Sequence, residues 1–463
     1  MQTTSALYKE IWADQSNCLE NVSLLGNFVT PDGQSYAQYN FPIPKNIVQG
    51  IDIQRSCYGQ SGEMLIGRTL AATLTASFIL DPNGTTPAQM LTNGIRKYKK
   101  VAYEPTSFNN CSWFTPQYCL EEEHAAEGQT EPRQSETISK GKFYLSEYEY
   151  DKYSNFWKIT AADKLAFMDA TVDWFFSPAT DGDATSDIDF LKKLLTPGIF
   201  TLPLEVDPRT YDYMDQGFPV DIVNSSISDT ELYVSTISVR EALGNLAALY
   251  GGNFILTADE KLLLVPFWKA DDDGNFDTVN SMGRIVGEYT NDDDMTYTGV
   301  VIETESGSTF SAGSMDNPLS FDCPWGSSAV ATFLNTKVSG KRFRGYSATN
   351  ARIDPAAELG DYVTIDGTTE LITCQQFDLR PGGLVSVSAP TYPSYTENSV
   401  YAPGRRMQMR QTAKTYSEAC SIKRYDTGLP IKDAYVLAQS TWERLVSDGA
   451  WEYDVLYLPI QGL

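Results

Sequence analysis

The sequence is nearly without histidine, a residue on which many enzyme active sites and metal sites depend. Its 463 residues include a single histidine, His124, so a metal site with several histidine ligands from this chain is excluded. A Ser-His-Asp triad would have to use this one imidazole, and no G-x-S-x-G motif accompanies it. His124 follows three glutamates in a polar segment, which indicates a solvated loop histidine.

Cysteine is also scarce, and its spacing is uninformative. The seven cysteines include no C-x-x-C pair, which excludes a thiolate zinc cluster of the usual spacing and gives no sign of a disulfide framework. Cys111 and Cys119 are nearest to each other in sequence, and we expect both to be free thiols because intracellular thiols stay reduced. The full set is Cys18, Cys57, Cys111, Cys119, Cys323, Cys374 and Cys420.

Basic residues are far fewer than acidic ones, and long apolar runs are missing. The 35 Lys and Arg stand against 60 Asp and Glu, which gives a formal net charge of −25. A chain this acidic is not expected to hold nucleic acid by neutralising phosphates. No apolar run of about eighteen residues and no N-terminal signal pattern occur, which favours a soluble protein made in the cytoplasm. A hydrophobic fraction of 42% suffices for several packed cores.

Nucleotide-binding motifs are absent, since neither G-x-G-x-x-G nor G-x-x-x-x-G-K-[ST] occurs. The stretch REALGNLAALYGGNFILTADEKLLLVP (240–266) has glycines, but a helix leads into them. Ser238 and Glu241 predict a capping box, and Gly251-Gly252 predicts the C-terminal end. A phosphate needs a helix N-terminus, whereas a helix C-terminus repels it. The stretch therefore predicts a capped helix followed by a buried hairpin.

Acidic patterns offer one candidate metal site. KADDDGNFD (269–277) contains Asp271, Asp273 and Asp277 near a glycine, and these are oxygen ligands that calcium prefers. The EF-hand register, however, puts Lys269 where an acid is required, so an acidic solvated turn is favoured and calcium binding stays open. The many carboxylates do not single out a glycosidase pair.

Basic residues gather in one segment, KVSGKRFRGYSATNAR (337–352), which contains no acid. Lys341 and Arg342 beside Phe343 and Tyr346 are compatible with a nucleic-acid contact. A salt-bridging protein interface is favoured in so acidic a chain. Taken with the preceding patterns, the sequence predicts no catalytic, cofactor-binding or metal-ligating residue.

Hydrophobic periodicity predicts an α+β, mainly β, multidomain protein. RTLAATLTASFIL (68–80) alternates as a half-buried strand does, and residues 142–168 indicate a hairpin running into a short helix. DIDFLKKLLTPG (187–198) has helical spacing and ends at Pro197-Gly198. LGDYVTIDGTTELITCQQFDLRPGGLVSVSAP (359–390) predicts a three-stranded meander.

Four segments resemble, in order, passages of the tail hub proteins of long-tailed bacteriophages and prophages. They are GKFYLSEYEYDKYSNFWKITAADKLAFMD (141–169), SVREALGNLAALYGGNFILTADEKLLLVPF (238–267), GVVIETESG (299–307) followed by NPLS (317–320), and FRGYSATNARIDPAAELGDYVTIDG (343–367). We call them the four landmarks. In that family an Asp-Pro shortly before Glu-Leu-Gly-Asp leads into a barrel strand, and Asp354-Pro355 and Glu358 to Asp361 match it here.

The resemblance implies a homotrimeric baseplate or tail-tip hub of a virion. Its paired β-barrel-like domains would form a ring that joins the tail tube or distal tail protein above to a spike or fibre below, beside the tape measure protein. It implies an N-terminal β-rich hub domain (1–170), a mixed α/β domain with the helix-hairpin unit (171–282), a second β-rich hub domain (283–395) and a C-terminal linker, helix and strand (396–463).

The resemblance also bears on chemistry. Many such hubs continue into a peptidase, a wall-degrading enzyme or a receptor-binding module, whereas here only about sixty residues follow the linker at 391–404, so no enzymatic activity is expected. Residues 271–322 hold twelve Asp or Glu and one basic residue, Arg284, and such a surface would repel DNA passing through the ring. The alternative is a carbohydrate-binding or carbohydrate-active β-protein that stacks its 27 Tyr and 8 Trp on sugars.

Overall fold

The computed structural model describes residues 2–14, 16–30, 35–43, 48–58, 65–79, 95–97, 108, 111–125, 128–151, 153–154, 156–168, 185–195, 204–220, 238–268, 278–280, 289–291, 295–304, 307–351, 353–365, 368–378 and 385–389. Several sequence predictions lie outside these residues. They are the acidic turn at 271–277, the helix stop at Pro197-Gly198, Cys420, and the linker, helix and strand beyond residue 390.

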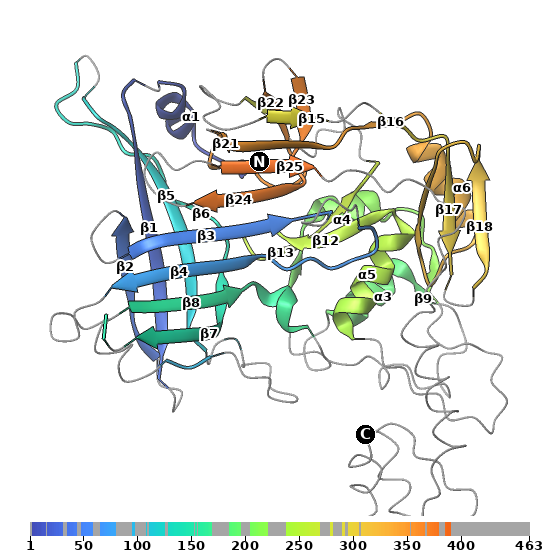
Figure 1. Ribbon diagram of the computed structural model, residues 1–463, viewed down its shortest axis with the longest axis horizontal. Coiled ribbons are helices and arrows are strands. Elements are labelled where there is room, and N and C mark those ends of the chain that lie inside the picture. Colours follow the sequence, from blue (N-terminus) through green and yellow to red (C-terminus); the bar gives the residue numbers. More distant parts are fainter. Residues whose placement is uncertain are drawn as a thin grey trace, which may run out of the picture.

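One large antiparallel sheet of twelve strands dominates the molecule and curls into an open half barrel (Figure 1). Its spatial order is β15 (Tyr289–Asn291), β21 (Tyr346–Ala351), β25 (Val385–Ala389), β24 (Cys374–Asp378), β3 (Val48–Ser56), β4 (Thr73–Ile79), β8 (Phe156–Ala162), β7 (Phe143–Asp151), β5 (Trp113–Glu122), β1 (Cys18–Val29) and β2 (Ser35–Ile43), and β6 (Ile138–Ser139) also pairs with β5. The mainly β, α+β fold class predicted from periodicity is confirmed.

Strands from distant parts of the chain meet in this sheet. β3 pairs with β24, so that Arg55 lies opposite Gln375 and Ile53 opposite Phe377. The strands of the N-terminal region therefore form one continuous sheet with β21, β24 and β25. The strand predicted at 68–80 is β4, whose Leu74 and Ala76 are fully buried, and the hairpin predicted at 142–168 is β7 and β8 followed by the short helix η1 (Lys164–Phe167).

The segment 359–390 forms two separate hairpins, so the predicted meander is wrong. β22 (Tyr362–Ile365) and β23 (Thr368–Leu371) pair with each other, and β22 pairs with β14 (Thr278–Asn280) in a small sheet apart from β24 and β25. The chain leaves one sheet for the other at Ile372 and Thr373. There the Ile372 N–H donates to the Asp361 carbonyl, and the Thr373 carbonyl accepts from the Cys57 N–H. The bond between Thr373 and Cys57 joins distant parts of the chain and leaves no trace in local hydrophobicity.

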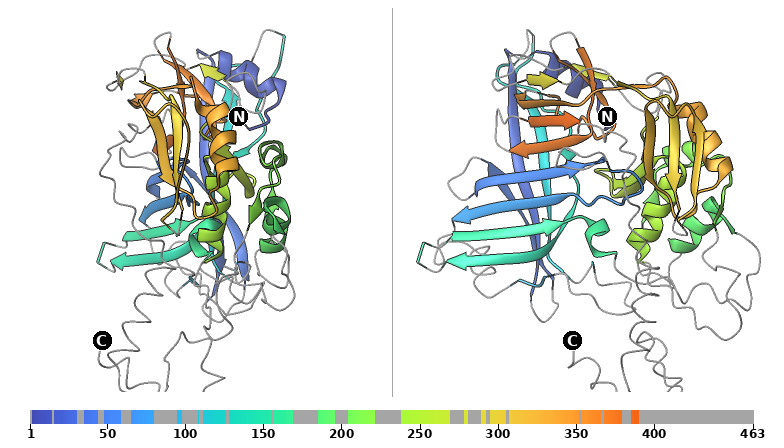
Figure 2. Two further views of the ribbon diagram at one scale, coloured as in Figure 1. Left: turned by 90° about the vertical axis from the view of Figure 1, so that its right-hand side faces the viewer. Right: turned by 45° about the vertical axis from the view of Figure 1, so that its right-hand side comes forward.

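The helix-hairpin unit lies between the large sheet and a three-stranded sheet at the other end of the molecule (Figure 2). Its helix α5 begins at the predicted capping box of Ser238 and Glu241 and ends before Gly251, which has a φ of 61°. The elements of this region are β9 (Thr185–Ser186), α3 (Asp187–Leu194), β10 (Glu205–Val206), α4 (Pro208–Tyr213), β11 (Pro219–Val220), α5 (Val239–Leu249), β12 (Gly252–Leu256) and β13 (Lys261–Pro266).

The three-stranded sheet has the order β18-β17-β19 and is covered by helix α6, which the sequence did not predict. Ser327 caps this helix by accepting from the Val330 N–H. The elements are β17 (Gly299–Glu303), β18 (Thr309–Gly313), β19 (Pro318–Asp322) and α6 (Ser328–Val338), and the remaining ones are α1 (Ala6–Ala13), β16 (Met295–Thr296) and β20 (Arg342–Phe343). Among the described helices, none is long and apolar enough to span a membrane.

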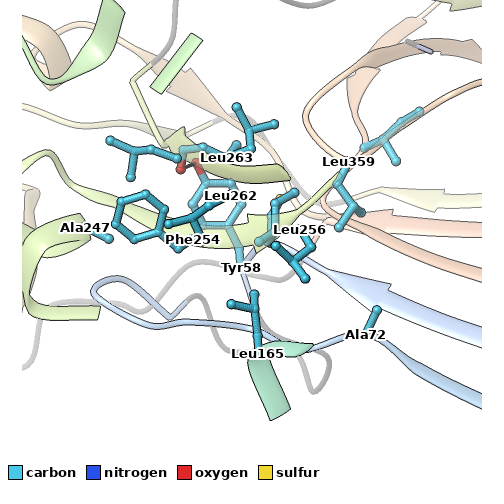
Figure 3. Packing of buried hydrophobic residues seen from close by; sticks show 14 of the residues in the cluster. Tyr58, Ala72, Leu165, Ala247, Phe254, Leu256, Leu262, Leu263 and Leu359 are labelled. Carbon is cyan, nitrogen blue, oxygen red and sulfur yellow. Dashed lines mark hydrogen bonds between the residues drawn. The ribbon is translucent and has the colours of Figure 1, made fainter. Parts of the chain in front are cut away.

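One continuous hydrophobic core joins these regions. Figure 3 shows side chains from several elements gathering around the hairpin, among them Tyr58, Leu165, Phe254, Leu256 and Leu359. Phe254 and Leu165 are fully buried, and Leu359 is 2% exposed. The helix-hairpin unit therefore shares its core with the large sheet, and the two cannot separate without exposing apolar surface.

Candidate functional site

The structure brings the predicted helix-hairpin unit against the segment that precedes β4. The Gly67 N–H donates to the Gly252 carbonyl, and the Leu70 N–H donates to the Phe254 carbonyl. Gly67 and Gly244 make this approach possible, because a Cβ at Gly244 would lie 2.7 Å from the Gly67 carbonyl oxygen. The glycine-bearing stretch is therefore a structural joint, as its sequence predicts.

A buried asparagine holds the same joint from the side of the hairpin. The Asn253 side chain accepts from the Arg68 N–H at 2.7 Å and donates to the Cys57 carbonyl at 2.7 Å. Asn253 is fully buried, and leaving such backbone groups without partners costs about 1–3 kcal/mol each. The amide thus fixes the end of β3 against β12.

Next to this joint, ionisable side chains from five chain segments meet in the interior. We call this cluster the polar junction and define it as Tyr8, Arg55, Lys140, Asp163, Asp354 and Glu358. None of these side chains is more than 8% exposed. Charged residues are rarely buried so deeply unless they are paired, so their number here marks a place that the fold depends on.

Hydrogen bonds connect the polar junction to its surroundings. The Tyr8 hydroxyl donates to Asp354 at 2.9 Å, which ties α1 to the Asp-Pro of the fourth landmark. Glu358 accepts from the Ala258 N–H at 3.2 Å, and the Arg55 guanidinium donates to the Leu256 carbonyl at 3.0 Å. The fourth landmark is thereby bound to the hairpin of the second.

Asp163, in the first landmark, connects η1 to the start of β4. Its two carboxylate oxygens accept from the Ala72 N–H at 2.8 Å and from the Leu165 N–H at 3.0 Å, so it caps η1 and fixes the start of β4. Burial raises the pKa of this carboxyl to about 7. A neighbouring carboxylate, Glu260 in the turn of the hairpin, accepts from Tyr144 at 2.9 Å and pairs with Lys164 at 3.0 Å.

Lys140 is the least compensated member of the polar junction. It is 1% exposed, its ammonium has no hydrogen-bond partner, and it lies 4.7 Å from the centre of the Phe377 ring. Burial, and then the nearby charge of Arg55, lower its pKa to about 7, although Asp354 and Glu358 act in the opposite direction. The folded protein therefore bears a cost for keeping this lysine charged.

Replacing Lys140 by methionine should raise the free energy of unfolding, and more so in acid. The folded pKa of about 7 lies below the unfolded value of about 10.4, so between these values only the unfolded state holds the proton and stability falls as pH decreases. We expect the gain of Lys140→Met to be larger by about 2 kcal/mol at about pH 6 than at about pH 9 in urea unfolding.

The exposed strand residue Lys158 provides the matched control, because Lys158→Met removes an ammonium that water already solvates. Its effect should be small and should not change with pH. A Lys140→Met variant that is equally destabilised at both pH values would contradict the assignment of an unpaired buried cation.

The histidine and the cysteine pair considered in the sequence analysis are not members of the polar junction. His124 is in an exposed loop, where its backbone N–H donates to Asn17 at 2.7 Å and its carbonyl accepts from Asn17 at 3.0 Å, as expected of a loop histidine. Cys111 and Cys119 are free thiols, as predicted, and burial raises the pKa of Cys111 to about 12. Within the part of the chain that the structure describes, no group of His, Cys, Asp and Glu could hold a metal ion.

Basic residues of the segment 337–352 make contacts with other parts of the same chain. Arg344 forms an ion pair with Glu370, and Lys337 lies 4.7 Å from the centre of the Trp268 ring. The side chain of Arg342 and all of Arg352 lie outside the described residues. Arg344 therefore joins the turn between β20 and β21 to β23, and Lys337 joins α6 to the residues that follow β13.

Most aromatic side chains among the described residues serve the interior. Phe333 of α6 makes edge contacts with Phe218, Tyr250 and Trp268, with ring centres 5.5–5.9 Å apart. The large exposed rings in the described part of the chain are Tyr150, Tyr153 and Tyr211. A sugar-binding surface lined by stacked aromatics has little support in this arrangement.

No protein-family model and no curated protein matches this chain. Among solved structures it resembles the tail protein from Neisseria meningitidis MC58, at 12% identity and a TM-score of 0.40, covering 80% of this chain and 99% of that one. It also resembles the 43 kDa tail protein of prophage MuSo2 from Shewanella oneidensis, at 13% identity and a TM-score of 0.40, covering 79% and 97%. Prophage tail protein gp18 from Listeria monocytogenes EGD-e matches at 12% identity and a TM-score of 0.36, covering 84% and 99%.

These three solved structures are described as tail proteins, two of them from prophages. At these scores the likeness carries no argument about function.

Proposed function

We propose that this chain is a structural hub protein of a phage tail tip, which forms a homotrimeric ring between the tail tube and the spike or fibre and has no chemistry of its own. Its β-rich regions 1–170 and 283–395 build the ring, and the mixed region 171–282 braces them. Its neighbours in the virion are the tail tube or distal tail protein, the tape measure protein and the spike or fibre proteins.

The observation that carries this proposal is the meeting of three ordered landmarks at one buried place. Asp163 of the first landmark, the hairpin of the second, and Asp354 and Glu358 of the fourth belong to or contact the polar junction. If the landmarks were chance similarities made of common residues, nothing would require their residues to meet at one buried place. In this chain the matched residues are the ones that hold distant segments together.

The same residues favour a scaffold over an enzyme. The carboxylates of the polar junction accept hydrogen bonds from backbone N–H groups and from Tyr8, and they are buried. A general acid or base must reach a substrate within hydrogen-bond distance. These groups serve cohesion between segments.

The acidic surface has a role in this proposal. DNA leaving the capsid passes through the ring, and carboxylates along the lumen repel its phosphates and prevent the binding that would stall transit. Asp316 and Asp322 are exposed members of the acidic stretch 271–322. The electrostatic potential along the pore of an assembled ring tests this part, and a basic lumen would contradict it.

The mass of the purified chain in solution tests the ring. We expect a species of three times 51.4 kDa by light scattering or native mass spectrometry, either alone or after mixing with the adjoining tail proteins. A chain that stays monomeric in every such mixture and depolymerises glycans would instead support the carbohydrate-active alternative.

A further inference from the structure

β18 is an edge strand of the three-stranded sheet β18-β17-β19. β18 pairs with β17 along one side, and no strand among the described residues pairs with its other side. Figure 1 shows it at the margin of the molecule, beyond β17. Edge strands of this kind present a row of backbone groups that another strand can bind.

The register fixes which backbone groups point outward. The Thr304 N–H donates to the Ser308 carbonyl, and the Ser314 N–H donates to the Thr298 carbonyl. In an antiparallel pair, hydrogen-bonded residues alternate with residues whose backbone groups point the other way. The backbone N–H and C=O groups of Phe310 and Ala312 therefore also point toward β17. The N–H and C=O groups of Thr309 and Ser311 therefore point away from the sheet, and both residues are exposed.

This edge lacks the features that usually protect one. Residues 309–313, TFSAG, contain no charge and no proline. The opposite edge of the same sheet, β19, begins at Pro318 and ends at Asp322. Phe310 and Ala312 are half-buried against the core on the side of the sheet that α6 covers. An added strand would extend this apolar face, and on the opposite side it would extend the polar face that carries Thr309 and Ser311.

The polar face carries unbalanced negative charge. Glu303 of β17 lies opposite Thr309 of β18 on one side and opposite Asp322 of β19 on the other. The carboxylates of Glu303 and Asp322 are therefore neighbours on this face. Burial, and then the neighbouring Asp322 carboxylate, raise the pKa of Glu303. Burial also raises the pKa of Asp322, although the nearby charge of Arg68 acts in the opposite direction. Among the described residues, no cation forms a salt bridge with Glu303.

We propose that β18 is a docking edge for an extended segment of another protein, which adds a strand beside Thr309 and Ser311 and places a lysine or arginine on the polar face. That long side chain reaches across Thr309 to Glu303, which lies two strand spacings, or about 10 Å, from the added strand. A second copy of this acidic chain is a poor occupant, because pairing through the same edge would add another Glu303 and Asp322 to the surface.

Binding of a short synthetic peptide to the full chain tests this proposal, whatever the function of the chain. The probe is a fluorescent peptide of alternating threonine and valine with one central lysine on the threonine face, and its control has glutamate in place of lysine. We expect the lysine peptide to bind about fivefold more tightly or better, and Glu303→Gln to remove the difference. Failure of both peptides to bind, or equal binding of both to the wild-type chain, overturns the proposal.

Position 311 separates backbone pairing from side-chain contact. Ser311→Pro removes an outward N–H but leaves the bonds of β18 to β17, so peptide binding should weaken about tenfold or more. Ser311→Ala keeps the N–H and should bind as the wild type does. Unchanged binding to Ser311→Pro overturns the proposal.

Hydrogen exchange of the wild-type chain gives a measurement that needs no folded variant. Adding the lysine peptide should slow amide exchange at Thr309 and Ser311 and leave that at β19 unchanged. Protection at β19 alone, or a dimer of the chain formed through β18, would show a different edge or occupant and would contradict the proposal.

Discussion

Replacing Asp163 by alanine should lower the free energy of unfolding by about 2–6 kcal/mol, since two buried N–H groups each lose their acceptor at about 1–3 kcal/mol. The groups are the N–H of Ala72, at the start of β4, and that of Leu165, in η1. Asp163 is 5% exposed, so water cannot replace the carboxylate without opening the core. Urea unfolding followed by circular dichroism measures the loss.

Asp151 provides the matched control. It also accepts from a backbone N–H, that of Tyr153 at 2.9 Å, and from the Ser154 hydroxyl at 2.7 Å, but it lies at the exposed end of β7. Asp151→Ala should change stability little because water solvates the released groups. Equal losses in the two variants would mean that Asp163 is no more than a turn residue and that the polar junction does not hold the segments together.

Replacing Phe254 by alanine should cost about 3–5 kcal/mol, which is a large share of the stability of an ordinary domain. Phe254 is fully buried in the hairpin core shown in Figure 3, among residues such as Ala247 of α5 and Leu262 of β13. Its backbone bonds to Arg68 and Leu70 remain in the variant, so the loss reports side-chain packing and the cavity left behind.

Two variants bracket that result in thermal and urea unfolding. Phe254→Leu keeps most of the volume and should cost less than the alanine variant. Tyr153→Ala removes a ring that is 88% exposed and should have little effect. A Phe254→Ala variant as stable as Tyr153→Ala would show that the helix-hairpin unit is loosely attached to the large sheet.

Local signals in the sequence were sufficient for the helix-hairpin unit. The capping box of Ser238 and Glu241 and the helix end at Gly251 depend on residues that are close in sequence. They can therefore be predicted from the local sequence alone. The alternation that predicts β4 is local in the same way, because it follows which side of a strand is buried.

Such local signals could not predict which distant strands pair with each other. Gln376 donates to Asp52 from 324 positions away, and the β3 and β24 strands that carry them give no local indication of each other. The same limit explains the incorrect meander, since the change of sheet after Ile372 depends on the bond between Thr373 and the distant Cys57.

Burial of charge was the least predictable feature. Lysine is almost never fully buried, and nothing in the neighbourhood of Lys140 in the sequence distinguishes it from an exposed lysine. Asp354 and Glu358 were singled out only through the resemblance to tail hubs. Their contacts with Tyr8 and Ala258 now give the physical reason why this turn carries these residues.

The position of the chain in assembled tails tests the hub proposal most directly. Electron cryomicroscopy of purified tails, with an antibody fragment bound to the chain, should place the fragment on a threefold ring at the end of the tail away from the capsid. Fragments along the tube or on the capsid, or purified tails without this chain, would contradict the proposal.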